Sequence, residues 1–395
     1  MELNFEQGPI RPPSEAESLL IRATRNCPWN KCTFCHSYHD SKFSLRSVEE
    51  IKQEIDAMHA IAESIAELSC KRGQGGKVND SIVQMIFNDY GFSDAYRSVA
   101  AWLYFGGKSV FLQDANSIIM KTEDLVEVLK YIKVKFPFVD RITSYGRSKT
   151  AAKKTVEDFV KLKAAGLSRI HVGMESGYDP VLEFIKKGET AADHIEGGKR
   201  IMAGGISLCE YIIPGMGGDK WSTEHAKQTA EVLNEINPDY IRLRSLQVRE
   251  GTALYTMMKE GLFTPLADED VLKEIRLLLE NLHCRDTYVV SDHILNLLQE
   301  IEGKLPDDKA RLLGVIDRYF SMSLKDRMIT DSAEGGESTT VWMTWRIFAF
   351  MIGSGRLSKN TKRKILSNST GIYIKRCMAS YRYSLRYLLQ PLSGP

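Results

Sequence analysis

The sequence predicts an α/β fold, built as a partial (β/α)6 barrel with a helical extension at its C-terminal end. Between about residues 18 and 250, short apolar runs alternate with helical patterns six times, which is typical of parallel strands joined by helices. Loops rich in Gly, Ser and Asp follow the apolar runs. After residue 250 the alternation gives way to helical spacing alone. An open, doubly wound sheet is the alternative, because a number of strands does not by itself indicate closure.

Six apolar runs are expected to form the strands, and they lie at residues 18–24, 108–116, 140–147, 168–176, 207–218 and 239–248. The helices expected after them lie at 44–68, 122–136, 153–166, 179–187, 190–205 and 222–237. Ser44 or Ser47 is a plausible N-cap of the first helix, which has acidic residues in its opening turn. Gly166 suits the position just after a helix.

The chain divides into an N-terminal segment (1–17), a barrel core (18–250) and a helical extension (251–395). The core contains a long, partly helical insertion at about 60–107, with an exposed loop in its middle. Apolar residues at helical spacing predict three helices in the extension, at 269–282, 292–303 and 307–322.

Composition restricts the class of protein. Hydrophobic residues make up 43% and charged residues 26% of the 395, which is ordinary for a globular protein. The net charge of +2 gives no clear signal for nucleic acid or for an anionic membrane surface. No apolar run is long enough for a membrane span, and the first residues lack the pattern of a secretion signal. We therefore expect a cytoplasmic protein without a membrane span.

The segment RATRNCPWNKCTFCHSYHD directly follows the first predicted strand and carries three of the seven cysteines in a C-x4-C-x2-C pattern. The other four are scattered singly: Cys70, Cys209, Cys284 and Cys377. Three thiolates on a short loop can hold three irons of a cubane cluster and leave the fourth iron without a protein ligand. The amino and carboxylate groups of a methionine could occupy that vacancy.

Two other interpretations of the cysteines remain open. A structural zinc site needs a fourth ligand, which His36 or His39 could supply. A redox pair formed by Cys32 and Cys35 would leave Cys27 unexplained.

Beyond the cysteines, the tract GLSRIHVGMESGYDPVLEFIKKGETAADHIEGGKRIMAGGISLCEYIIPGMGG resembles the radical S-adenosylmethionine (radical SAM) superfamily. It is similar to the branch that contains coproporphyrinogen dehydrogenase-like, Elongator-like and methylthiotransferase-like enzymes, and the likeness covers roughly residues 19–248. Two features depart from the pattern. One residue is inserted into the usual C-x3-C-x2-C spacing, and LQDANS (112–117) stands where the superfamily has Gly-Gly-Glu.

The resemblance implies a [4Fe–4S] cluster and S-adenosylmethionine as cofactors. It implies that Cys27, Cys32 and Cys35 ligate iron. Phe34, the aromatic residue before the last cysteine, would lie along the adenine.

The resemblance also implies a binding site for the methionyl end of the cofactor. Gln113, Asp114 and Asn116 would hold this end in place of the missing Gly-Gly-Glu element, since carboxylate and amide oxygens both accept hydrogen bonds from an ammonium. Glu175 and Ser176 would reach the ribose hydroxyls or the methionyl group. A turn that caps the next helix is the alternative for this pair.

Pro214, Gly215 and Met216 would border the adenine, or would form an ordinary turn between a strand and a helix. Arg242 and Arg244 alternate along the sixth predicted strand and therefore face the same side. If that side is the barrel interior, the two guanidinium groups need anionic partners. A cofactor or substrate carboxylate would serve, and so would a protein acid.

These features predict an enzyme with a single cluster that cleaves S-adenosylmethionine reductively and abstracts hydrogen from an organic substrate of small or medium size. A reductant protein such as a flavodoxin or a ferredoxin would supply the electron. Two alternatives are a methyltransferase that uses two S-adenosylmethionine molecules, and a non-catalytic carrier of haem or an iron–sulfur cluster. Only 26 residues precede Cys27, so no cobalamin domain is expected before the cluster.

Overall fold

The computed structural model describes residues 3–38, 41–293, 295–323 and 327. Its main sheet has eight strands, in the order β1-β4-β5-β6-β7-β8-β9-β10. Neighbouring strands run parallel throughout, except that β10 is antiparallel to β9. The strands are β1 (Leu19–Arg22), β4 (Ser109–Gln113), β5 (Arg141–Gly146), β6 (Leu167–Glu175), β7 (Ser207–Ile212), β8 (Tyr240–Leu243), β9 (Tyr288–Val290) and β10 (Gly303–Lys304).

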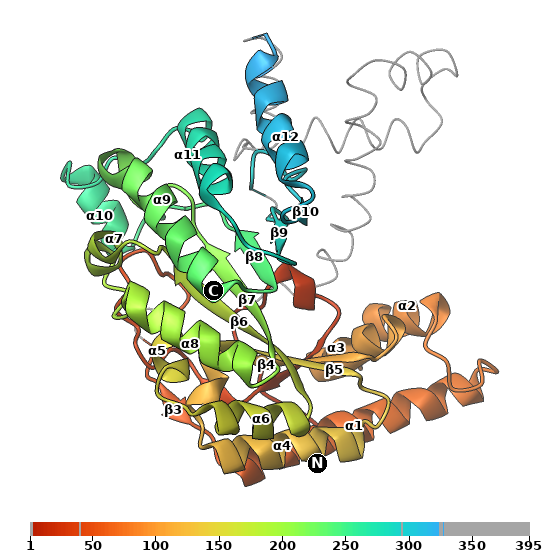
Figure 1. The fold of residues 1–395 in the computed structure, drawn as a ribbon. Coiled ribbons are helices and arrows are strands. Elements are labelled where there is room, and N and C mark those ends of the chain that lie inside the picture. The colour runs from red at the N-terminus through yellow and green to blue at the C-terminus, as the bar shows by residue number, and fades with distance from the viewer. Residues whose placement is uncertain (1–2, 39–40, 294, 324–326, 328–395) are drawn as a thin grey trace, which may run out of the picture. The chain divides into compact units, whose positions relative to one another are not determined.

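Helices follow the strands along the chain. They are α1 (Val48–Lys71), α2 (Asp80–Asn88), α3 (Asp94–Tyr104), α4 (Thr122–Lys135), α5 (Ser148–Ala151), α6 (Val156–Ala164), α7 (Asp179–Phe184), α8 (Ala191–Ala203), α9 (Gly218–Ile236), α10 (Ala253–Lys259), α11 (Asp268–Asn281) and α12 (Lys309–Ser321), with short 3-10 turns η1 (Pro13–Glu15) and η2 (Ser117–Ile119). Figure 1 shows α4, α6, α8 and α9 along one face of a curved sheet. The predicted α/β fold is confirmed, and β1 and β4 to β8 are its six expected strands.

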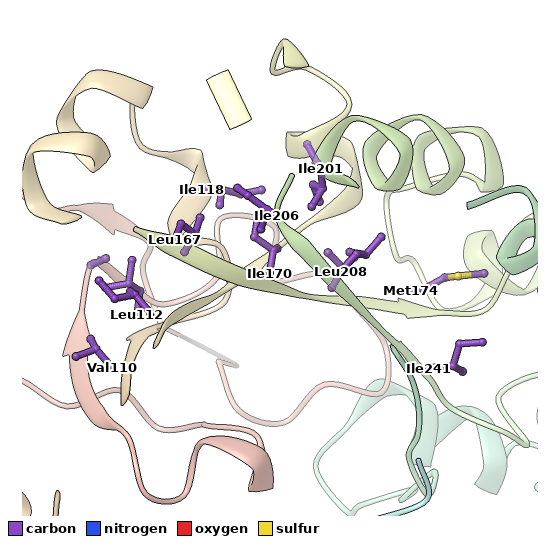
Figure 2. Packing of buried hydrophobic residues seen from close by; sticks show 14 of the residues in the cluster. Val110, Leu112, Ile118, Leu167, Ile170, Met174, Ile201, Ile206, Leu208 and Ile241 are labelled. Atoms are coloured by element: carbon purple, nitrogen blue, oxygen red, sulfur yellow. The ribbon is translucent and has the colours of Figure 1, made fainter. Parts of the chain in front are cut away.

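The face of the sheet that meets the helices is apolar. Val110 and Leu112 of β4, Ile170 of β6 and Leu208 of β7 are fully buried there, and Figure 2 shows Val110 and Leu112 at one side of this layer and Ile170 and Leu208 nearer to Ile201 of α8. Alternate residues of a strand point to opposite faces, so one register sets the whole apolar layer. Burying each such side chain contributes about 1.5–3 kcal/mol.

The opposite face of the sheet is aromatic and polar. The ring of Phe111 lies 5.0 Å from that of Tyr145, and the ring of His171 lies 5.8 Å from that of Tyr211. Phe111 and His171 each alternate with apolar residues of the helix-facing layer, as the strand period requires. This inner wall is the surface that a bound molecule inside a barrel would meet.

Glu15 of η1 enters this wall from the end where the strands begin. Its fully buried carboxylate accepts 2.8 Å hydrogen bonds from Arg141 at the start of β5 and lies 3.1 Å from Nε2 of His171. The Nδ1 atom of His171 lies 3.2 Å from the Tyr211 hydroxyl. The carboxylate of Glu15 therefore links β5 and β6, and His171 extends this link to β7.

Local signals explain where the first helix and the insertion lie. Ser47 caps α1, and its hydroxyl accepts from the N–H of Glu50 in a reciprocal capping box. The segment 60–107 is partly helical: α1 extends to Lys71, an exposed loop follows, and α2 and α3 complete the segment. Gly166 follows α6 with a φ of +114°, as its predicted position requires.

The segment after residue 250 differs from the sequence prediction. The described residues of 292–303 form no helix, so that prediction is wrong, and β9 instead adds a seventh parallel strand beside β8. Polar contacts to β8 give the reason. Asp292 pairs with Arg242, and Asn296 bonds to the carbonyl of Leu243 and to Ser245, which holds the segment against the sheet edge. One compact unit runs to Met322.

No helix in the described part of the chain combines the length and the apolar composition needed to cross a membrane.

Candidate active site

The three clustered cysteines lie on a loop between β1 and α1, at the carboxyl end of the parallel strands. Two short strands close the base of this loop: β2 (Thr24–Arg25) pairs antiparallel with β3 (Ser44–Leu45). The carboxyl ends of neighbouring parallel strands meet at one edge, which is where ligand sites form in such folds. The sequence therefore places the cysteines on the functional edge of the sheet.

Cys27, Cys32 and Cys35 are free and partly buried. The N–H of Asn30 lies 3.4 Å from Sγ of Cys27, and the backbone N–H groups of Ser37 and Tyr38 bond to the Cys35 sulfur. Hydrogen bonds from backbone N–H groups to sulfur stabilise thiolates that bind iron. Three free thiols lie on one loop that the β2–β3 pair closes, and N–H groups donate to two of them. This set of groups fits the ligands of a cubane cluster.

The longer spacing between Cys27 and Cys32 gives room for Trp29. Its indole N–H donates a 2.7 Å hydrogen bond to the carbonyl of Lys186, and the Arg147 guanidinium lies 5.4 Å from its ring centre. Gly188 has a φ of +70°, and a Cβ there would stand 2.2 Å from the Trp29 ring. Through Trp29 the cysteine loop docks on the connection between α7 and α8.

A buried charge cluster lies beside Cys32. Nζ of Lys187 is 3.0 Å from Oε1 of Glu175 and 3.9 Å from Oε2 of Glu189, and Nε of Arg147 is 3.3 Å from Oε1 of Glu189. Burial raises the pKa of the Cys32 thiol to about 11, while Lys187 and Arg147 act against that rise. Burial alone would lower the pKa of Lys187, but Glu175 and Glu189 outweigh it, so the lysine stays charged. A fixed positive charge thus faces the cysteine loop.

The three residues expected at the methionyl end all have protein partners. Gln113 exchanges hydrogen bonds with the backbone of Gly8, and the Asp114 carboxylate accepts from Arg22 and from the N–H of Asn26. Asn116 donates to Thr150 and accepts from the N–H of Arg147. All three are fully buried. In this arrangement they tie the N-terminal segment, the cysteine loop and the start of α5 to the end of β4.

Glu175 ends β6 with a φ of +65°, and its carboxylate points to Lys187. The Ser176 hydroxyl accepts a 3.0 Å hydrogen bond from the N–H of Tyr178. This bond belongs to a turn before α7, which is the alternative role that the sequence offered for Ser176. Of the pair, Glu175 is the one whose charged group lies beside the cysteine loop.

The structure brings Phe34 and Met216 together. Both belong to a small apolar cluster with Val181 and Ile185, apart from the main core. Pro214 and Gly215 line a pocket of about 110 Å³, and the N–H of Gly215 donates to the buried carboxylate of Glu274 at 2.7 Å. Of the residues expected along the adenine, Phe34 and Met216 therefore share one apolar cluster, while Pro214 and Gly215 line a separate pocket.

Arg242 and Arg244 share a partner in Asp292. Nη1 of Arg242 bonds to Oδ2 of Asp292, and Nη1 of Arg244 lies 3.9 Å from Oδ1. The guanidinium of Arg244 stacks 4.7 Å above the Tyr211 ring. Both arginines therefore face the inner wall, as their alternation predicts, and the protein acid that was one of their alternatives is present.

The histidines proposed as zinc ligands give no site in the described residues. Nε2 of His36 lies 3.0 Å from the Arg249 guanidinium, and His39 and Cys377 lie outside the described part of the chain. Within that part, no three His, Cys, Asp or Glu side chains converge as ligands of a single ion.

Sequence patterns alone do not mark several residues of this site. Lys187 and Glu189 stand in the polar run FIKKGET, which has the composition of a solvated helix end. Trp29 is visible as the one large aromatic residue inside the lengthened cysteine spacing. Its docking partner, however, is Gly188, which is far away in the sequence.

Comparisons with known proteins identify sequence relatives. No family model matches the chain. A tRNA uridine(34) acetyltransferase of Methanocaldococcus jannaschii is 29% identical over 124 residues, which are 31% of this chain and 22% of that protein. A tRNA-2-methylthio-N(6)-dimethylallyladenosine synthase of Hahella chejuensis is 23% identical over 311 residues, 78% of this chain and 57% of that one. The chain thus spans less than two thirds of these relatives.

Solved structures with a similar arrangement include the radical SAM enzyme coproporphyrinogen III oxidase of Escherichia coli, with a TM-score of 0.44 and 15% identity over 67% of this chain and 52% of that one. Methylornithine synthase has a TM-score of 0.41 and 14% identity over 77% and 74% of the two chains.

The sequence relatives include a tRNA uridine(34) acetyltransferase and a tRNA-2-methylthio-N(6)-dimethylallyladenosine synthase. The cysteine loop lies at the end of the first parallel strand. The sequence relatives and the position of the cysteine loop agree with the resemblance to the radical SAM superfamily that the motifs indicate.

Proposed function

We propose that this chain is an enzyme that binds a [4Fe–4S] cluster through Cys27, Cys32 and Cys35 and uses it to cleave S-adenosylmethionine. Together these cofactors, which the superfamily uses, supply a 5′-deoxyadenosyl radical that takes a hydrogen atom from an organic substrate. The observation that carries the proposal is the position of three free thiols on one loop, facing the buried pair of Lys187 and Glu175.

The chain's own residues would bind both ends of S-adenosylmethionine. An amino acid carries one ammonium and one carboxylate, so its binding site needs one anion and one cation. Glu175 and Lys187 offer both beside Cys32, and both are largely screened from solvent. We therefore assign the methionyl end to this pair. Gln113, Asp114 and Asn116, at the end of β4, would hold the neighbouring segments in place, with Asp114 bonded to the start of the cysteine loop.

The adenine would lie on the apolar side of the loop. Phe34, which is partly buried, provides aromatic surface there and packs on the buried Met216, and Gly215, with a φ of +82°, allows close approach of the backbone. A largely apolar wall also excludes water, which protects a reactive species from side reactions.

The direct test is formation of 5′-deoxyadenosine. Protein reconstituted anaerobically with iron and sulfide is incubated with dithionite and S-adenosylmethionine, and products are separated by chromatography. We expect 5′-deoxyadenosine from the unaltered protein and none from Cys32→Ala. Cys70→Ala is the matched control, since Cys70 is a free, exposed cysteine on α1. Equal product from Cys32→Ala and Cys70→Ala would contradict the proposal, as would an unaltered protein that holds a cluster but forms no product.

Lys187→Met tests the assignment of the methionyl end. Loss of a charge-assisted contact costs about 1.5–3 kcal/mol, so the Kd for S-adenosylmethionine should rise about 10- to 100-fold. Lys186→Met is the control, because Lys186 is adjacent and exposed. If both variants bind S-adenosylmethionine equally well, Lys187 does not hold its carboxylate.

A further inference from the structure

The inner wall carries more positive than negative charge near the end of β8. Arg242 and Arg244 both face this wall, and in the described residues Asp292 is the one acid within ion-pair distance of either. Its Oδ2 atom bonds to Arg242, while Arg244 stands farther off at 3.9 Å. The nearby pair of Lys187 and Glu175 balances its own charges. One guanidinium is therefore left without a full anionic partner.

Three nitrogen atoms at this place are buried and have no hydrogen-bond partner in the structure: Nε of Arg242, Nη1 of Arg244 and Nδ1 of His293. One acceptor, Oδ1 of Asp292, is also buried and unpartnered, and it lies 3.9 Å from Nη1 of Arg244. Burial, helped by Arg244, lowers the pKa of His293 to about 4, so the ring is neutral at pH 7 and one of its nitrogens carries a proton to donate. Buried donors without partners are costly to the folded protein. The two arginines and His293 bring three unpaired or weakly paired nitrogen atoms to this place against one acid, Asp292, and this excess of donors and of positive charge indicates a site for an anion.

The surface next to these donors is aromatic. The Arg244 guanidinium stacks on Tyr211, and the rings of Tyr211, His171 and Tyr145 follow one another across three strands. Tyr145 is only partly buried, unlike the other two. A flat or apolar body can lie on such a surface while its charged group reaches the arginine.

We propose that Arg244, supported by Arg242 and His293, binds a carboxylate or phosphate group of the substrate, whose remaining part lies against Tyr211 and Tyr145. This inference rests on the proposed function, because it concerns the molecule from which hydrogen is taken. The substrate is then an organic anion. Arg244 fixes its orientation, since a guanidinium binds both oxygens of a carboxylate or phosphate.

Binding of simple anions to the full chain tests this inference without a cluster. Calorimetric titrations with benzoate, inorganic phosphate and the neutral analogue benzamide compare the unaltered protein with Arg244→Gln and Arg244→Lys. We expect benzoate or phosphate to bind more tightly than benzamide, and the tighter of the two identifies the group. Arg244→Gln should raise its Kd about 10- to 100-fold, and Arg244→Lys should raise it less.

Arg169→Gln is the control. Arg169 lies on the same inner face, but near the start of β6, whereas Arg244 follows the end of β8. The Arg169 guanidinium lies over the ring of Tyr240. This variant should bind the anion like the unaltered protein. The inference is overturned if neither anion binds better than benzamide, or if Arg169→Gln weakens binding as much as Arg244→Gln. It is also overturned if saturating S-adenosylmethionine displaces the anion from reconstituted protein, since Arg244 would then hold the cofactor.

The two proposals fail in different ways. Anion binding without 5′-deoxyadenosine formation would leave this site standing and overturn the proposed function. Formation of 5′-deoxyadenosine by a protein that binds no anion would do the reverse.

Discussion

The carboxylate of Asp114 accepts a 2.7 Å hydrogen bond from the backbone N–H of Asn26, the residue directly before Cys27. The same oxygen accepts a 2.7 Å bond from Nε of Arg22. Asp114 has a φ of +70° just after β4, and Asn26 has a φ of +65° just after β2. Two strained turns on neighbouring segments are thus held together by one buried carboxylate. The cysteine loop begins at that point.

Asp114→Asn should loosen this loop. The amide keeps the shape and one acceptor but removes the charge that pairs with Arg22, so we expect a loss of about 2–4 kcal/mol in the free energy of unfolding. The reconstituted variant should also retain less iron. Urea unfolding and iron analysis measure the two effects. Asp94→Asn removes an exposed partner of Arg97 and should cost less than about 1 kcal/mol. If the two variants behave alike, Asp114 does not anchor the loop.

Gly188→Ala should displace Trp29. A Cβ at Gly188 would stand 2.2 Å from the indole and would also sit on a backbone with a φ of +70°. Gly251→Ala separates these effects, because Gly251 has a φ of +85° and nothing within 4 Å of its added Cβ. We expect Gly188→Ala to lower stability more than Gly251→Ala and to weaken iron retention, which Gly251→Ala should not. Equal iron content in both variants would mean that the docking of Trp29 is not needed to hold the loop.

Glu15 makes the free energy of unfolding depend on pH in the acidic range. Burial alone would raise its pKa, but the hydrogen bond from His171 and the charges of His171 and Arg141 outweigh it and lower the pKa to about 2. A carboxyl whose pKa is lower in the folded state contributes stability above its unfolded pKa of 4.5, and this is lost as pH falls toward 2. The contribution lost between pH 5 and pH 2 is up to about 3 kcal/mol.

Glu15→Gln should therefore be less stable than the unaltered protein at pH 6. The difference should shrink as the pH falls to 2, which chemical unfolding at a series of pH values measures. A difference that stays constant over this range would show that the carboxylate is not ionised in the folded protein.

The pKa of Glu210 is shifted in the opposite direction to that of Glu15. Glu210 is fully buried on β7, neither carboxylate oxygen has a hydrogen-bond partner in the structure, and burial raises its pKa well above the usual value. The folded protein therefore keeps a proton that the unfolded chain releases above about pH 4.5, so stability falls as pH rises through that value.

Glu210→Gln removes this dependence. We expect the variant to be more stable than the unaltered protein at pH 8 by on the order of 1–3 kcal/mol, and about equally stable at pH 4. Glu231→Gln on the exposed side of α9 serves as the control and should show little change at either pH. A Glu210→Gln variant whose advantage does not grow between pH 4 and pH 8 would contradict a protonated Glu210.

The sequence was sufficient to predict the strands and the cysteine loop, because both depend on local patterns. Short apolar runs between helical patterns indicate β4 to β8, and the C-x4-C-x2-C spacing indicates the cysteine loop. The prediction of a helix at 292–303 was wrong because apolar residues at helical spacing also occur in an irregular segment. Contacts of Asp292 and Asn296 hold this segment to β8. Such contacts between distant residues leave no periodic signal.

The same limit applies to the site. Gln113 and Asp114 could be named as polar groups after a strand, but their partners include Gly8 and Asn26, about a hundred residues earlier. Lys187 resembles its exposed neighbour Lys186 in sequence, and only the fold turns it toward Glu175. Arg242 and Arg244 were accessible to prediction because strand alternation fixes their common side.

Electron paramagnetic resonance of the reconstituted, dithionite-reduced protein tests most directly whether the cysteine loop holds a cluster with one iron open to S-adenosylmethionine. We expect the signal of a reduced [4Fe–4S] cluster, whose g-values change when S-adenosylmethionine is added. A signal that S-adenosylmethionine does not alter, or no cluster signal at all, would contradict the central proposal that these three thiols leave an iron for the cofactor.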